Sequence, residues 1–254
     1  MGYSQGQIIQ FQDTLIHWTD RSSDLIDVLL ARNYHQPRAE EIAKHGLARR
    51  LQMIRHCIRR TFEILPPETT EPDRDDLMDA TAFLHTFIFN LYGAIDNAAR
   101  LWCIEADLRL ASGKPLRKFD IGLTQNHAIV RSSLSASFQL FLSNINDWFC
   151  YLESYRHALA HRIPLYIPPK CLNADEVRKF ERFNKLLDNS TDTPDLYKQH
   201  HAEQAKIGKF SPQIMHSYSD GARPIFLHAQ MICDYSTVIE IGEWMTKELT
   251  IMSA

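Results

Sequence analysis

The sequence LMDATAFLHTFIFNLYGAIDNAARLW, residues 77–102, decides the expected fold. Its apolar residues recur at helical spacing along one side, and further aromatic residues occupy much of the remaining circumference. The first set is Leu84, Phe87, Ile88, Leu91, Ile95, Ala98 and Trp102, and the second is Phe83, Phe89 and Tyr92. A helix that is apolar nearly all round belongs inside a group of helices. We therefore predict a central helix from residue 77 to about residue 112, ended by Gly113 and Pro115.

Helical patterns on both sides of this stretch predict an all-α fold. Residues 38–65 carry apolar side chains at the three-and-four spacing of one amphipathic helix, between prolines that interrupt helices at either end. Residues 1–21 show only weak periodicity. Further helices are expected over 22–33, over 125–163 with an interruption near 131–135, and over 224–252. Together these helices predict an up-and-down bundle of four to five long helices.

The chain divides by composition into three parts. Residues 1–169 are expected to form the helical core, and the composition becomes more polar and charged from Lys170 onward. Residues 170–222 are interpreted as a polar arm inserted before the last helix. Residues 223–254 are expected to supply that last helix and complete the bundle.

Within the arm, two short charged helices are expected. A capping box formed by Asn173 and Glu176 opens the first, which runs to about residue 187, and Thr193-Pro194 opens the second, which Gly208 ends. Residues 210–218 have a more extended character and could pair with the extended segment 165–168 that follows Pro164. Residues 219–221 are predicted to form a turn.

The composition excludes several classes of protein. A chain of 254 residues with 44% hydrophobic residues can bury one sizeable core without metals or disulfides as staples. Its five cysteines occur singly, which indicates reduced thiols in a cytoplasmic protein and no zinc ribbon. There is no apolar run of 18 residues and no secretory leader pattern, so we expect neither secretion nor a membrane span. The glycine motifs of Rossmann, P-loop and α/β-hydrolase proteins are missing.

The candidate site lies in the sequence DWFCYLESYRHALAHRIPLYIPP, residues 147–169. On a helical wheel Arg156 falls at the centre of an apolar stripe made by Phe149, Leu152, Leu159 and Ile163. A buried guanidinium costs several kcal/mol unless it is paired and hydrogen-bonded. Asp96, the carboxylate midway along the central helix, is the expected partner. A purely structural Arg156–Asp96 ion pair is the alternative to a functional site.

Two histidines follow Arg156 on the same helix. His161 lies roughly 140 degrees from Arg156 on an ideal helix, and His157 roughly 40 degrees from His161. The helix alone therefore does not aim the arginine and His161 at one point. The long arginine stem, a distorted last turn before Pro164, or a second subunit could bring them together.

A rival interpretation of the same helix is a metal site. Glu153, His157 and His161 recur at four-residue spacing, which aligns three ligand types on one helix face. Metal sites in helical proteins usually draw ligands from facing helices as well, and the other long helices carry no second pattern of this kind. We therefore expect no metal and no cofactor.

The 38–65 helix carries a basic flank that could bind phosphate. Its members are Lys44, Arg49, Arg50, Arg55, Arg59 and Arg60. A solvated basic face is the more common meaning of such a pattern, and both interpretations remain open. The net charge of −3 argues against a generally basic coat for nucleic acid, although it leaves room for a local basic face.

The run Arg156-His157-Ala-Leu-Ala-His161, at the end of a helix in an all-helical chain, resembles the R-x4-6-H motif of the HEPN superfamily. The expected helices 77–112 and 125–163 would match the antiparallel core pair of that family. Many HEPN proteins are metal-independent endoribonucleases that dimerise so that two motifs line one cleft. Others are inactive and serve as binding or assembly modules.

The resemblance implies roles for individual residues. His161 would act as general acid or base on the RNA, and Arg156 would hold the scissile phosphate. His157 would support orientation, with Asp96 and the neighbouring Tyr155 as supporting residues. Arg55, Arg59 and Arg162 are the candidate RNA-binding residues. The expected function is a homodimeric ribonuclease, and the alternative is a non-catalytic module that binds a nucleotide or another protein.

Overall fold

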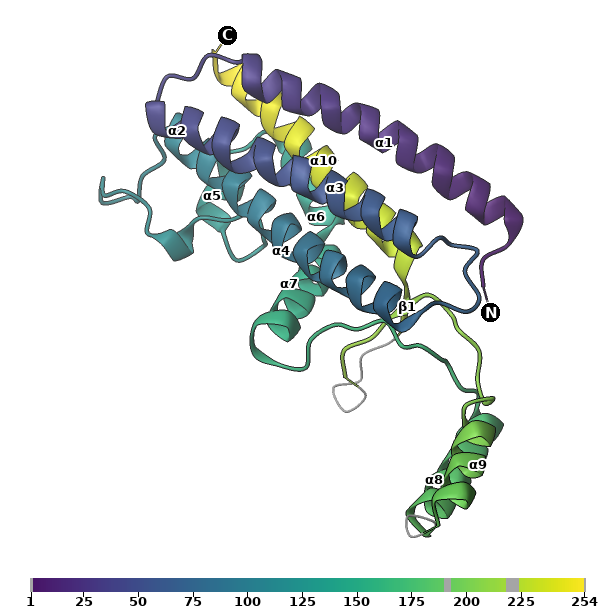
Figure 1. Cartoon of the computed structure of the whole chain (residues 1–254). Helices are drawn as coiled ribbons and strands as arrows, with labels where there is room; N and C mark the ends of the chain where they lie inside the picture. Colours follow the sequence, from purple (N-terminus) through teal and green to yellow (C-terminus); the bar gives the residue numbers. More distant parts are fainter. Residues whose placement is uncertain (1, 190–192, 218–223, 254) are drawn as a thin grey trace.

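The computed structural model describes residues 2–189, 193–217 and 224–253 and has an all-helical fold (Figure 1). Four long helical segments lie side by side. They are α1 (Gln5–Ala31), a continuous rod made of α2 (Pro37–Glu41), η1 (Ile42–Leu47) and α3 (Ala48–Ile64), then α4 (Arg74–Glu105), and α10 (Leu227–Ser253). The all-α prediction is confirmed for the described residues.

Helix α4 is the central element, as its sequence predicts. It packs against the η1–α3 part of the rod, against α10 and against α7 (Asn146–His161). Leu84, Phe87, Ile88 and Leu91 are completely buried along it. Burying such side chains stabilises the fold by roughly 1.5–3 kcal/mol each relative to leaving them exposed.

Helix α4 ends at Glu105, seven residues before the predicted end. The cause is local, because Asp107 has a positive φ of 44° and the chain then forms a tight turn at Gly113, whose φ is 77°. An aspartate tolerates this left-handed conformation better than most residues, whereas a helix cannot continue through it.

Helix α1 begins at Gln5, well before the predicted start at residue 22. Ser4 caps it, and its hydroxyl accepts the backbone N–H of Gln7. Leu25, Ile26 and Leu29 of α1 belong to the core, and Phe11, Leu15 and Trp18 pack against it while partly buried. The exposed Ile9 and Ile16 obscure this apolar face in the sequence of the first part of the helix.

The predicted 125–163 helix is three helices, α5 (Ala128–Ser132), α6 (Ala136–Asn144) and α7. The interruption near 131–135 is confirmed, and Ser135 is its cause. The Ser135 hydroxyl accepts the backbone N–H of Phe138 at 3.3 Å and so caps α6. The buried Glu248 of α10 accepts both the backbone N–H and the hydroxyl proton of Ser135.

Residues 170–217 leave the body of the molecule and return to it. Helices α8 (Ala174–Asn189) and α9 (Pro194–Gln204) contain no buried residue and pack on each other as a projecting hairpin (Figure 1). The predicted extended pairing is confirmed, because Tyr166 and Met215 form an antiparallel bridge. A short pair of strands, β1 (Gln213–Ile214) and β2 (Ile225–Phe226), then leads into α10. The predicted turn at 219–221 lies outside the described residues.

A short 3-10 turn, η2 (Lys118–Asp120), lies in the loop between α4 and α5. Among the described helices, none combines the length and the apolar composition needed to cross a bilayer.

Candidate functional site

Arg156 projects from α7 onto α4, where it lies over the ring of Tyr92. Its guanidinium carbon is 4.9 Å from the ring centroid, which is a cation–π contact. The residue is half-buried rather than buried. Within the described part of the chain, Arg156 has no hydrogen bond or ion pair with a carboxylate. The guanidinium therefore rests on an aromatic surface, and no carboxylate among the described residues accepts its N–H donors.

The expected ion pair between Arg156 and Asp96 is wrong. Asp96 pairs instead with Arg100 of its own helix, with 3.8 Å between Oδ2 and the guanidinium nitrogen. The Asp96 side chain is 44% exposed, so it lies at the rim of α4 rather than on its buried face. One turn earlier, Tyr92 occupies the position facing Arg156. Burial raises the pKa of Tyr92, nearby Asp96 raises it further, and Arg156 lowers it.

His157 and His161 share another face of α7. Their ring centroids are 6.4 Å apart, and His157 Nε2 lies 4.0 Å from the Glu153 carboxylate one turn earlier. His161 is exposed at the last residue of the helix. Within the described ranges, no group of three histidine, cysteine or acidic side chains is arranged to hold a metal ion.

Tyr155 points into the core, away from the exposed histidines. It is 4% exposed, and its ring contacts those of Tyr151 and His216 at centroid distances of 4.3 and 5.6 Å. Burial raises the pKa of Tyr155 to about 12. Tyr155 therefore anchors α7 to the core.

The same core region contains a buried carboxyl group that sequence reasoning missed. Asp234 of α10 accepts hydrogen bonds from Trp148 Nε1 at 2.8 Å and from Gln230 Nε2 at 2.7 Å, and the Tyr151 hydroxyl lies 3.4 Å away. Burial raises the pKa of Asp234 to about 7, although these hydrogen bonds lower it. Asp234 lies in a stretch of α10 that also carries Gln230 and Ser236, and its place in the sequence gives no hint that three donors converge on it.

The candidate RNA-binding arginines are not gathered around Arg156. Arg55 donates to the Ser23 hydroxyl at 2.8 Å, and Arg59 pairs with Glu63 on its own helix. Both arginines line a groove shared by α1 and α3. Arg162 directly follows α7, where the backbone becomes extended.

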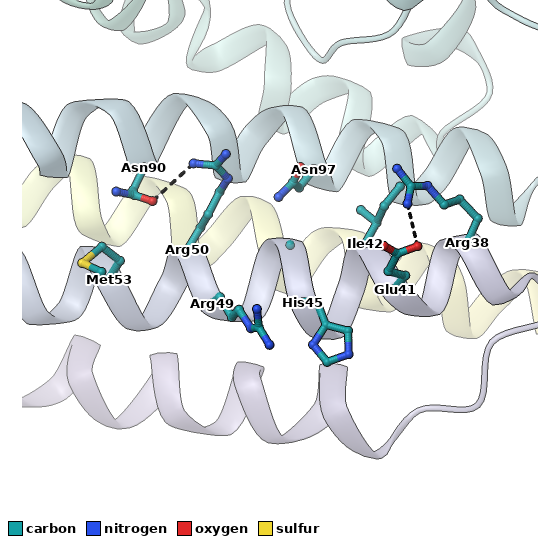
Figure 2. Close-up of a pocket in the computed structure, with 10 residues that line it drawn as sticks. Arg38, Glu41, Ile42, His45, Arg49, Arg50, Met53, Asn90 and Asn97 are labelled. Atoms are coloured by element: carbon teal, nitrogen blue, oxygen red, sulfur yellow. Dashed lines mark hydrogen bonds and ion pairs between the residues drawn. The ribbon is translucent and has the colours of Figure 1, made fainter.

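A hollow lies between the α2–η1–α3 rod and α4, and two members of the predicted basic flank, Arg49 and Arg50, line it. It has a volume of about 450 Å³. Figure 2 shows Arg50 reaching from α3 toward α4, where it donates to Asn90 Oδ1 at 3.3 Å, and Arg38 paired with Glu41. Ten residues line it: Arg38, Glu41, Ile42, His45, Gly46, Arg49, Arg50, Met53, Asn90 and Asn97.

Two features of the sequence relate to this hollow. The basic flank of the rod was visible, but its relation to α4 was not. Gly46 and Gly93 both interrupt strong helix patterns, and a conspicuous glycine inside a helix usually has a packing or functional reason. The structure gives the packing reason, because Gly46 lies against the Asn97 side chain of α4 and Gly93 lies against the Arg50 side chain of α3.

The fold and these side chains define an all-helical protein with an arginine- and histidine-bearing helix end and a basic hollow. No protein-family model, no curated protein and no solved structure matches this chain.

Proposed function

We propose that this chain is a HEPN-like up-and-down helical bundle that cleaves RNA as a homodimer without a metal. The observation that carries the proposal is the state of Arg156. Its guanidinium lies over the ring of Tyr92, the residue is half-buried, and it has no carboxylate partner in the described part of the chain. A guanidinium held in this way keeps its planar set of donors available for a phosphate group.

The proposed reaction needs one acid–base group and one phosphate-binding group. A neutral His161 imidazole would accept the proton of an RNA 2′-hydroxyl, whose oxygen attacks the adjacent phosphorus. Arg156 would stabilise the charge that develops on the phosphate oxygens. The P–O5′ bond breaks, and an imidazolium gives its proton to the leaving 5′ oxygen. The products are a 2′,3′-cyclic phosphate and a 5′-hydroxyl, so protons and charges balance.

The direction of the side chains on α7 supports a site made from two subunits. Arg156 faces Tyr92 on α4, while His161 shares its face with His157. A second copy related by a two-fold axis could bring the His161 of one subunit to the Arg156 of the other. His157 would then orient the substrate from the same helix end as His161.

The second candidate function is a non-catalytic module that binds a nucleotide or a protein. The exposed α8–α9 hairpin favours this alternative, because it extends from the body with no buried residue of its own.

An RNA cleavage assay with purified full-length protein tests the proposal. We expect the wild type to cleave single-stranded RNA in the presence of EDTA. His161→Ala should reduce the rate by at least about 100-fold, because general acid–base catalysis contributes roughly 10²–10⁴-fold. His17→Ala is the matched control, since His17 is an exposed histidine on α1, and it should cleave at the wild-type rate.

Three outcomes would count against the ribonuclease. Loss of cleavage in EDTA would favour a metal-dependent reaction. Equal rates for His161→Ala and wild type would remove His161 from the mechanism. No cleavage of any RNA tested would favour the binding module.

A further inference from the structure

The hollow beside η1 carries unpaired positive charge. Within the described residues, Arg49 and His45 make no hydrogen bond or ion pair, and Arg50 donates to the neutral side-chain amide of Asn90. Arg38 is paired with Glu41 at 2.5 Å. The lining thus contains three guanidiniums and one carboxylate. We propose that this hollow is a binding site for a small organic phosphate of nucleotide size. It is separate from Arg156 and His161 on α7, and the proposal does not depend on RNA cleavage by those residues.

Arg50 is fixed in position before any ligand arrives. Asn90 accepts from its guanidinium, and the Asn90 amide nitrogen is itself held by the carbonyl of Thr86 at 2.8 Å. The guanidinium also lies directly against the backbone of α4 at Gly93, where an added Cβ would come within 2.3 Å of its central carbon. A charged group that is positioned in advance loses less conformational entropy when it binds an anion.

Asn97 of α4 supplies a further hydrogen-bonding group to the hollow. Its carboxamide nitrogen reaches the backbone of the rod at Gly46, 2.7 Å from where a Cβ would lie. It makes no hydrogen bond within the described residues, although a carboxamide can donate two and accept two. Figure 2 shows Asn97 pointing from α4 toward the rod, with Arg49 and His45 on the other edge of the rod.

The local backbone also distinguishes this place from an ordinary basic helix face. Residues Ile42–Leu47 form a π-helical turn, in which the Ala48 N–H bonds to the Ala43 carbonyl five residues earlier. Such turns occur often at functional sites. A volume of about 450 Å³ is within the range of small-molecule sites, and Met53 adds an apolar contact. The arrangement suits a phosphate on the arginines and a polar organic group at Asn97.

Isothermal titration calorimetry with the full chain and adenosine 5′-diphosphate as the probe tests this site. We expect saturable binding to the wild type, and at least about tenfold weaker binding of adenosine, which lacks the phosphates. Inorganic pyrophosphate, which has no organic part to contact Asn97, should bind more weakly than the nucleotide. Arg50→Ala should weaken nucleotide binding by about tenfold or more.

Gly93→Ala tests whether the position of the Arg50 guanidinium matters for binding, because it moves this group without removing its charge. The new methyl group must displace the guanidinium, yet the net charge is unchanged, and alanine favours a helix more than glycine does. We expect Gly93→Ala to weaken binding about as much as Arg50→Ala. The controls are Gly6→Ala, where no atom lies within 4 Å of the new Cβ, and Arg178→Ala on the α8–α9 hairpin. Both should bind the nucleotide like the wild type.

If the wild type shows no saturable nucleotide binding, the proposal is wrong. It is also wrong if Gly93→Ala binds the nucleotide with the affinity of the wild type. If an RNA oligonucleotide binds through Arg50 while the nucleotide does not, the hollow is an RNA surface and the proposal is wrong. Circular dichroism of each variant checks folding, and Gly93→Ala provides the test if Arg50→Ala does not fold.

Discussion

The buried carboxyl group of Asp234 should make the free energy of unfolding depend on pH. Its carboxyl group is completely enclosed and has a pKa of about 7, raised by burial. In an unfolded chain an aspartate titrates near pH 4, roughly. Between about pH 4 and pH 7 the folded chain therefore holds a proton that the unfolded chain has released. Stability contributed by this group is greatest below about pH 4 and falls as the pH rises to about 7.

Asp234→Asn should remove this pH dependence. Asparagine resembles the protonated acid, because its oxygen can accept from Trp148 and Gln230 while its amide donates to Tyr151. We expect the variant to be more stable than the wild type at pH 8, on the order of 3 kcal/mol, and similar to it at pH 4. Urea denaturation at several pH values measures the difference in free energy of unfolding.

Asp96→Asn is the matched control, since Asp96 is half-exposed and, among the described residues, pairs with Arg100 of its own helix. Its difference from the wild type should stay below about 1 kcal/mol across the same pH range. A difference between Asp234→Asn and wild type that does not change with pH would contradict the role given to Asp234.

At the scale of the helices, Glu105 joins the end of α4 to the start of the α2–α3 rod. Its side chain has no exposed surface, and it accepts the backbone N–H groups of His35 at 2.6 Å and Gln36 at 3.2 Å. Gln36 is the residue immediately before α2, so Glu105 satisfies donors that the helix start would otherwise leave unpaired.

Glu105→Ala should destabilise the protein by about 3 kcal/mol, because it leaves partly buried backbone donors without an acceptor. Glu153→Ala is the comparison, since Glu153 is exposed on α7, and it should change stability by less than about 1 kcal/mol. Chemical denaturation measures both. A Glu105→Ala variant as stable as Glu153→Ala would show that these hydrogen bonds contribute little.

The helices differ in how well their sequences predict them. The α2–α3 rod and α4 have dense apolar patterns between helix-breaking residues, and both were predicted from spacing alone. The break between α5 and α6 was expected, but the cap at Ser135 depends on Glu248, more than a hundred residues later in the chain. The early end of α4 depends on a left-handed Asp107, a conformation that no local pattern indicates.

The candidate site was predictable only in part for the same reason. The helical wheel correctly separated Arg156 from the histidines of α7. Asp96 was the wrong choice as the neighbour of Arg156, because Tyr92 lies one turn earlier on α4 and the contact depends on how the two helices meet. The hollow at Arg50 likewise requires the register between α3 and α4, which brings Gly93 under the guanidinium.

At the scale of the whole molecule, the central claim is that two subunits share each active site. The different directions of Arg156 and His161 on one helix are the reason for this proposal. Size-exclusion chromatography with light scattering should therefore find a dimer in solution. A strict monomer at the concentrations used for cleavage would exclude a shared site.

Mixing two inactive variants tests this claim most directly. Arg156→Ala and His161→Ala should each be inactive alone, whereas a mixed dimer would contain one site with both residues intact and one with both replaced. After equal amounts are mixed and allowed to exchange subunits, RNA cleavage should return to about a quarter of the wild-type rate. If subunits exchange and no cleavage returns, Arg156 and His161 do not act together across two subunits, and the account is contradicted.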